Sequence, residues 1–272
     1  MTKKILIGIG IIGIVMILGV AAYVLRPTAE ASAPIEAIAV KVDPTMTEEP
    51  MPDNSETRMS ASEEETKGEE IPAPKEAVEE PTVVPTEETT TTETDVVVFT
   101  IVQAESEVRF TLNEVLSGIP TTVIGTTDQV AGEIAIDPAA PENSKVGVIL
   151  VNARTLATDN NFRNRAINNE ILDTNEFEFV QFIPTSITGF SENPAIGEAI
   201  EFQITGDLTI RDITNEVTFD ATVTAVSESR LEGLASAMVA RADYGLQIPN
   251  VPRVADVDEE VLLEINFVAV TK

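Results

Sequence analysis

Cysteine, histidine and tryptophan are all missing from this chain of 272 residues. Without cysteine, the chain has no disulfide framework, no thiol nucleophile and no thiolate metal site. Without histidine, it also lacks the commonest general base of enzymes and the commonest protein ligand of zinc and copper. We therefore predict a protein that is not an enzyme, has no catalytic residues and holds no metal ion.

Basic residues are scarce, because 17 Lys and Arg stand against 46 Asp and Glu, for a formal net charge of −29. Such an acidic field repels phosphate backbones, and nucleic-acid binding is not expected. The charge is unevenly spread. The first 26 residues contain Lys3, Lys4 and Arg26 but no acidic residue, which separates a basic and apolar beginning from an acidic remainder.

Residues 5–25 form an uninterrupted run of apolar and small residues. As a helix this run is about 31 Å long, enough to cross a bilayer core of roughly 30 Å. Lys3 and Lys4 precede it and favour a cytoplasmic N-terminus, with the rest of the chain outside. The alternative is a cleavable signal peptide cut near Ala31-Ser32-Ala33. We predict that residues 1–26 are a transmembrane anchor or signal segment, and the length of the run favours the uncleaved anchor.

Residues 27–94 are rich in Glu, Thr and Pro and contain no aromatic residue. A chain with so little apolar surface and so much charge cannot offset its conformational entropy by burial. We predict a disordered acidic linker. It would serve either as a spacer that holds the following domain away from the membrane or as a passive tail.

The residue pattern changes in residues 95–272, where short runs of Val, Ile, Thr and Phe alternate with turn residues. Period-two alternation with one polar face is typical of antiparallel strands around one core. The predicted strands are 96–102, 107–112, 121–126, 129–136, 145–153, 176–183, 200–210, 216–226, 231–242 and 261–270. Residues 160–170 have helical spacing and predict one short helix. Many long strands favour a sandwich or a barrel, and a barrel removes exposed edges.

Several segments of this domain follow one another in a recognisable order. They are 106–110, 130–137, 158–164, 171–173, 206–214, 240–246 and 257–265. Together they resemble the YceI-like family of secreted or periplasmic proteins. Residues 206–214, for example, read Gly-Asp-Leu-Thr-Ile-Arg-Asp-Ile-Thr and are similar to the family's Gly-Asp-Leu-Thr-Ile-His-Gly-Val-Thr. The chain departs from the family at Glu105 and Arg211, which replace histidines, and at Glu178, where the family often has proline.

The resemblance implies an all-β, antiparallel, lipocalin-like β-barrel with one short helix. Some relatives hold a polyisoprenoid chain, such as an isoprenoid quinone-type molecule, in an apolar lumen. The inward positions of the predicted strands are therefore candidate ligand-binding residues. They are Phe110, Val148, Leu150, Val180, Phe182, Phe202, Ile204, Leu208, Phe219, Val223, Val239, Ile265 and Phe267. The same alternation would serve an ordinary packed core, and in that case the protein would be a structural or adhesion head.

Four arginines stand out in so acidic a domain, and Arg211 and Arg241 are the candidates for binding a ligand headgroup. Arg163 and Arg165 are further candidates for binding a headgroup, although each arginine could instead pair with a local carboxylate. A third alternative is a hydrolase that uses carboxylates.

The candidate acids of such a hydrolase are Asp159, Asp173 and Asp212, but all three lie beside turn signals where Asp commonly caps backbone N–H groups.

The prediction as a whole is a membrane-tethered, extracytoplasmic binding protein of bacterial type, periplasmic or extracellular. Its partner is an isoprenoid, quinone-like or other lipid, with no other cofactor. The sequence leaves the oligomeric state open, a homodimer included.

Overall fold

The computed structural model describes residues 27–32, 34–41, 96–190 and 195–271. The predicted anchor, residues 1–26, and most of the predicted linker lie outside these ranges. Within them, no helix combines the length and the apolar character that a membrane crossing requires.

The folded domain is one antiparallel sheet of 13 strands. In chain order they are β1 (Val97–Ile101), β2 (Glu107–Leu116), β3 (Ile119–Thr127), β4 (Val130–Ala131), β5 (Glu133–Ile136), β6 (Lys145–Val146), β7 (Ile149–Asn152), β8 (Phe179–Thr188), β9 (Ala199–Ile210), β10 (Ile213–Ser227), β11 (Arg230–Ala240), β12 (Val254–Ala255) and β13 (Glu260–Thr271). The predicted all-β class is confirmed, and the long strands lie close to their predicted bounds.

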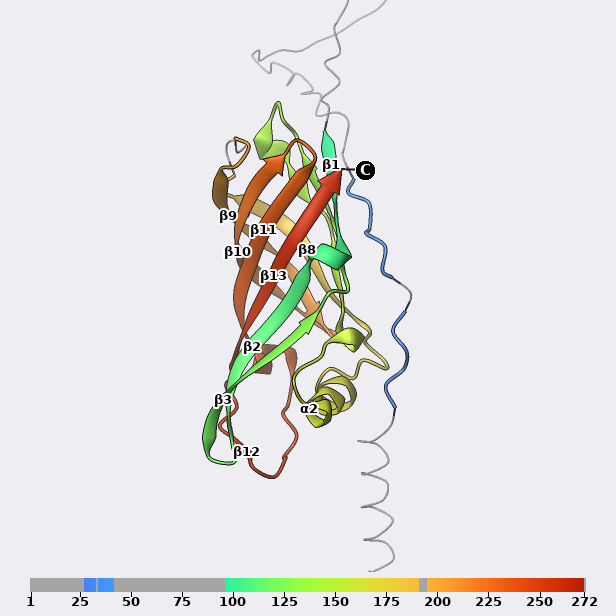
Figure 1. The fold of residues 1–272 in the computed structure, drawn as a ribbon, viewed down its shortest axis with the longest axis vertical. Coiled ribbons are helices and arrows are strands. Elements are labelled where there is room, and N and C mark those ends of the chain that lie inside the picture. Colours follow the sequence, from blue (N-terminus) through green and yellow to red (C-terminus); the bar gives the residue numbers. More distant parts are fainter. Residues whose placement is uncertain (1–26, 33, 42–95, 191–194, 272) are drawn as a thin grey trace, which may run out of the picture. The chain divides into compact units, whose positions relative to one another are not determined.

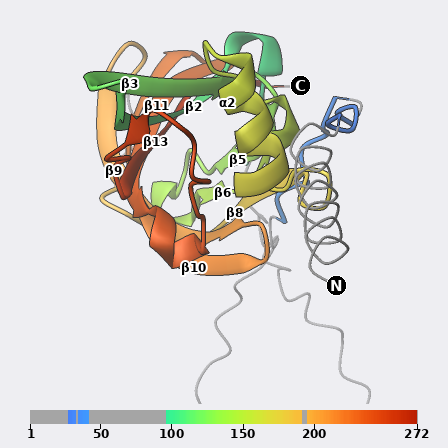
Figure 2. The same cartoon turned by 90° about the horizontal axis from the view of Figure 1, so that it is seen from below.

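The sheet is strongly curled (Figure 1). Its hydrogen-bonded path runs from β4 through β7 to β11 and on to β13, β1, β5 and β6. Because β4 leads into β5 and β6 leads into β7, the path returns to the strands where it began. Figure 2 looks along the domain from below and shows the strands arranged in a ring. The result is a lipocalin-like barrel, as the sequence predicts.

Alternating side chains explain why the strands form this barrel. In β9, Ile204 and Leu208 are buried, while Thr205 points outward and shares a 2.8 Å hydrogen bond with Thr218 of β10. Gly206 is required by packing, because a Cβ there would lie 2.4 Å from the carbonyl oxygen of Ile183 in β8. The strands therefore have one apolar face toward the centre and one polar face outside.

A short helix covers one end of the barrel (Figure 2). Helix α2 (Asn161–Ala166) continues as a π-helical turn (Ile167–Ile171), which confirms the helix predicted over 160–170. The Asn160 side chain caps its beginning by accepting hydrogen bonds from the N–H groups of Phe162 and Arg163. Satisfying these otherwise unpaired donors stabilises the first turn of such a helix.

Residues 27–41, of which residue 33 is not described, run along the outside of the barrel, and we call them the strap. The N–H of Ala29 donates to Asn175 at 2.8 Å, and the Nε2 amide of Gln103 donates to the carbonyl of Ile35 at 2.7 Å. The N–H of Val40 donates to Glu133 at 3.1 Å. The sequence predicts a disordered linker from residue 27 onward. The structure differs in the strap, which is hydrogen-bonded to the barrel.

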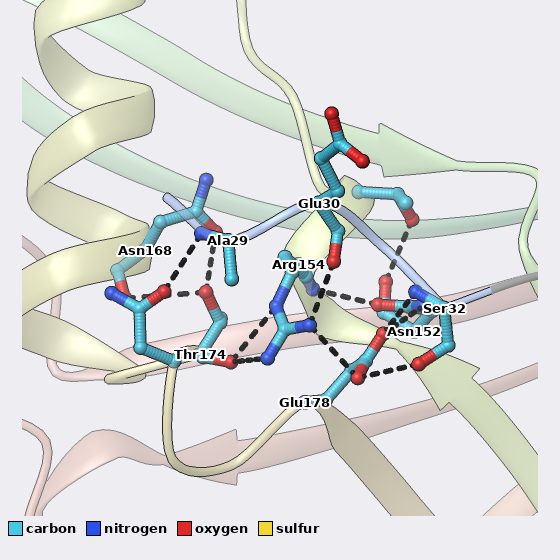
Figure 3. A network of polar contacts seen from close by, with 10 residues as sticks. Ala29, Glu30, Ser32, Asn152, Arg154, Asn168, Thr174 and Glu178 are labelled. Atoms are coloured by element: carbon cyan, nitrogen blue, oxygen red, sulfur yellow. Dashed lines mark hydrogen bonds and ion pairs between the residues drawn. The ribbon is translucent and has the colours of Figure 1, made fainter. Parts of the chain in front are cut away.

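The centre of the strap contacts an ion pair between Arg154 and Glu178 (Figure 3). The Ser32 N–H and hydroxyl donate to the two oxygens of Glu178 at 2.6 and 2.8 Å. Arg154 donates to the carbonyl oxygen of Glu30 at 2.9 Å and also to the carbonyl of Thr174. Composition did not reveal this docking, because its partners lie 124 and 146 residues away in the sequence.

Candidate functional site: an apolar cavity

The barrel encloses a cavity of about 1120 Å³. Its lining extends from Phe162 and Arg253 at the α2 end to Ile196 and Glu228 at the opposite end. Small-molecule sites commonly measure about 300–1,000 Å³, and the volume of this cavity is slightly above that range. A barrel solidly filled by its own side chains, one of the alternatives from sequence, does not fit this geometry.

Aromatic and small side chains together shape the interior. Phe182 and Phe219 make an edge-to-face contact with ring centroids 4.9 Å apart. Ala221 of β10 pairs across the strands with both Phe202 of β9 and Ala235 of β11. Both alanines line the cavity, and their short side chains leave the space that larger residues would fill.

Most of the predicted lumen residues line this cavity. They are Phe110, Val180, Phe182, Phe202, Ile204, Leu208, Phe219, Val223, Val239, Ile265 and Phe267. The structure thus brings these side chains together around one space. Their role in binding a ligand stays a prediction.

The prediction is wrong about the lumen position of Val148 and Leu150, which are not part of the lining, whereas Ile149 and Val151 are. The cause is a break between β6, which ends at Val146, and β7, which begins at Ile149. Because side chains alternate with period two, an irregularity of this kind exchanges the inward and outward positions of everything that follows. Gly147 within the predicted strand was the available signal.

Arg211, a predicted headgroup ligand, is not among the cavity-lining residues. It lies in the turn between β9 and β10 with a φ of 59°, and its guanidinium lies 5.6 Å from the centre of the Phe177 ring. The turn at the end of the two strands carries the side chain beyond the barrel interior. The structure therefore does not support Arg211 as a headgroup ligand within this cavity.

Arg241 does line the cavity, but its donors are engaged by the protein itself. Its Nε donates to the carbonyl of Asp258 at 2.8 Å, and its Nη2 donates to the carboxylate of Glu259 at 3.0 Å. A further contact of 3.4 Å reaches the carbonyl of Leu246. These bonds hold the segment after β11 against the beginning of β13, which is a structural role.

A buried ion pair between Arg163 and Glu114 belongs to the cavity lining and was not predicted. Arg163 of α2 donates to Glu114 of β2 at 2.8 Å, and their side chains are only 17% and 8% exposed. A signal was present in the sequence, because Glu114 continues the inward alternation of Phe110 and Leu112. An acidic residue at an inward position of a strand requires a cationic partner.

Tyr244 is 2% exposed and lines the cavity. Burial raises the pKa of its phenol, and the nearby Asp243 carboxylate adds to the rise. The hydroxyl therefore stays protonated at neutral pH. It adds a polar group, but no charge, to an otherwise apolar interior.

The carboxylates considered for hydrolysis, Asp159, Asp173 and Asp212, do not line the cavity. Asp159 pairs with Arg163 and is 85% exposed, Asp173 has a φ of 45° in a turn, and Asp212 is exposed. Among the described residues there is also no cluster of three acidic side chains that could hold a metal ion. The site is thus a largely apolar cavity.

An antiparallel barrel around a large apolar cavity defines a class of proteins that enclose small hydrophobic molecules. The YceI-like domain matches residues 99–269, and the chain belongs to this family.

The relatives agree with the family assignment. A UPF0312 protein of Staphylococcus aureus is 28% identical over 139 residues, covering 50% of this chain and 70% of the relative. A UPF0312 protein of Pseudomonas fluorescens is 27% identical over 145 residues, covering 52% and 71%.

A solved structure shares the fold. It is a polyisoprenoid binding domain from Saccharophagus degradans implicated in plant cell wall breakdown. The TM-score is 0.51 at 13% identity, with 65% of this chain and 99% of that chain covered.

Proposed function

We propose that the protein is a membrane-tethered, extracytoplasmic carrier that holds one isoprenoid-type or similar lipid chain inside its barrel. The observation that carries the proposal is the cavity of about 1120 Å³, whose lining is mostly aliphatic and aromatic. Membership of the YceI-like family and the fold shared with a polyisoprenoid binding domain support it.

The energetics favour a long apolar chain as the ligand. Each buried methylene contributes about 0.8 kcal/mol, so ten of them give a gross gain of about 8 kcal/mol. Ordering the chain and losing its free motion reduce this gain by several kcal/mol. Binding therefore depends on how much of the chain is enclosed, and an elongated cavity that extends between the two ends of the barrel encloses much of it.

The tether and the location are inferred from the sequence. Residues 5–25 have the length and composition of a membrane span, and Lys3 and Lys4 favour an N-terminus in the cytoplasm. This orientation places the barrel outside the cytoplasmic membrane of a bacterial-type cell. The family consists of binding proteins, and we propose no catalytic activity.

Solvent extraction of the purified full-length protein, followed by mass spectrometry, tests the ligand. We expect a chain lipid to be extracted in an amount comparable to that of the protein. Ala221→Phe places a ring in the cavity and should remove most of this lipid, because the alanine lines the open space.

Met238→Phe is the matched control, since Met238 is 56% exposed on β11 and not part of the cavity lining. This variant should keep its lipid. Wild-type protein without any chain lipid, or equal lipid in the Ala221→Phe variant, would refute the proposal.

A further inference from the structure

Three segments meet at the α2 end of the cavity, and we call them the rim: residues 117–120, 160–163 and 248–254. The N–H of Ser117 donates to the carbonyl of Arg253 at 2.7 Å, which joins the first segment to the third. The ion pair between Arg163 and Glu114 joins α2 to β2. Ser117, Arg163 and Arg253 also line the cavity, so the rim surrounds its mouth at this end.

Each segment of the rim exposes one large apolar side chain to solvent. Phe162 is 77% exposed, Ile119 is 66% exposed and Val251 is 40% exposed. A single exposed apolar residue is ordinary on a protein surface, but several around a ligand entrance indicate a surface that contacts another apolar phase. Proteins that lie at a membrane interface carry aromatic and aliphatic groups in this way.

Basic side chains accompany these apolar groups. The exposed Arg165 has its guanidinium 5.9 Å from the centre of the Phe162 ring, and Arg253 is exposed beside Val251. The opposite end of the barrel exposes Glu198 and Glu228, while the exposed acidic residues next to the rim include Asp159, which is paired with Arg163, and Asp256. Arginines at the edge of an apolar surface suit lipid phosphates, whereas exposed glutamates do not.

The strap fixes which end of the barrel lies nearest to the proposed anchor. Its first described hydrogen bond joins Ala29 to Asn175, which follows the π-helical turn that continues α2. From residue 25 to Ala29 the chain has four residues, and these span at most about 14 Å when fully extended. If residues 5–25 cross the bilayer, Asn175 must lie within about that distance of the end of the crossing.

The same length limit changes the interpretation of the acidic segment. A spacer role requires a free chain between the anchor and the domain, but the strap binds the barrel before residues 42–95 begin. Those residues connect the strap, which is hydrogen-bonded to the barrel, to β1, which is a strand of the barrel. They therefore cannot set the distance between the barrel and the membrane.

We infer that the rim rests on the outer surface of the bilayer, held there by the strap, and that the lipid passes directly between bilayer and cavity. The rim thus contacts a lipid surface. Phe162 inserts among the acyl chains, and the arginines lie at the phosphates. The inference rests on the proposed membrane tether. It adds an orientation, a contact surface and a route for the ligand.

Tryptophan fluorescence can test this orientation, because the chain contains no tryptophan of its own. Full-length Phe162→Trp protein is reconstituted in phosphatidylcholine liposomes, with and without lipids brominated on their acyl chains. We expect a blue-shifted emission that the brominated lipids quench strongly. Val226→Trp is the matched control, since Val226 is 42% exposed near the end of β10 that is opposite to α2 and is not part of the cavity lining. Its emission should be neither shifted nor quenched.

A second pair of variants tests the strap. Ala29→Pro with Ser32→Pro removes the N–H groups that donate to Asn175 and Glu178 and leaves the barrel sequence unchanged. Quenching at position 162 should then fall to that at position 226. Ala61→Pro with Ser62→Pro, in the acidic segment, should leave the quenching unchanged.

Equal quenching at positions 162 and 226 overturns the inference, and so does quenching at 162 that survives loss of the strap contacts. Failure of the tether gives a different result: alkaline carbonate would remove the full-length protein from the liposomes. That result refutes the proposed anchor and, with it, the inference. The extraction of lipid from the cavity is measured separately and is not affected.

Discussion

The ion pair between Arg163 and Glu114 should be essential for holding α2 over the barrel end. Arg163→Met keeps most of the side-chain volume but removes the charge, which leaves the Glu114 carboxylate in an apolar cavity lining without its cation. Breaking a buried ion pair from one side costs about 3–5 kcal/mol, because the remaining charge has no partner.

The geometry favours the lower end of that range. Arg163 keeps 17% of its side chain exposed, and the pair lies near the mouth of the cavity, so water can partly solvate the carboxylate. We therefore expect a loss of about 3 kcal/mol in the free energy of unfolding. For a domain of this size, such a loss lowers the melting temperature by about 6–12 °C.

Urea and thermal unfolding followed by circular dichroism measure the loss. Asp159→Asn is the control: Asp159 is the second partner of Arg163 but is 85% exposed, so its removal should cost less than about 1 kcal/mol. A double-mutant cycle with Glu114→Gln should give a coupling of about 2 kcal/mol. An Arg163→Met variant within about 1 kcal/mol of wild type, or a cycle without coupling, would show that this ion pair does not stabilise the domain.

Three further predictions concern the cavity, the strap and the sheet. Val151→Phe should reduce the lipid extracted with the protein while Leu150→Phe should not, and the reverse result would contradict the observed register of β7. Burial tends to raise the pKa of the Glu178 carboxyl, but hydrogen bonds from Ser32 and Asn152 and the charge of Arg154 outweigh burial and hold that pKa below its ordinary value. The docking contribution of Glu178 is therefore complete above about pH 4.5 and is lost as the pH falls through the lowered pKa. Hydrogen exchange in residues 27–41, corrected for its intrinsic pH dependence, should accelerate in that range in wild type but show no such step in Glu178→Gln. Gly206→Ala should lower the free energy of unfolding by about 1–3 kcal/mol, since the added Cβ meets the backbone of β8, and an unchanged urea midpoint would contradict this packing.

The barrel and most of its lining could be predicted because both follow from local patterns. Alternation in β9 and β10 placed Phe202, Ile204 and Phe219 on the inward face, and the structure agrees. The helix after Asn160 was predictable for the same reason, since its cap and its spacing are contained in a few neighbouring residues. Period and capping are short-range properties, and a single sequence is sufficient to find them.

The remaining features depend on irregularities or on contacts between distant residues. The break after Val146 changed the faces of Val148 and Leu150, and alternation alone cannot locate such a break. The strap was missed because its composition resembles a disordered segment and its partners are far along the chain. Glu178 was a hint, since it departs from the proline common in the family and now receives two hydrogen bonds from Ser32.

The strap also gives the chain two kinds of connection between its beginning and its barrel. One is covalent and passes through residues 42–95, and the other consists of the hydrogen bonds made by residues 27–41. A single proteolytic cut in residues 42–95 would remove the first connection and leave the second. The fragment that starts after such a cut would remain attached only while the strap stays bound, so its release would become reversible and sensitive to acid.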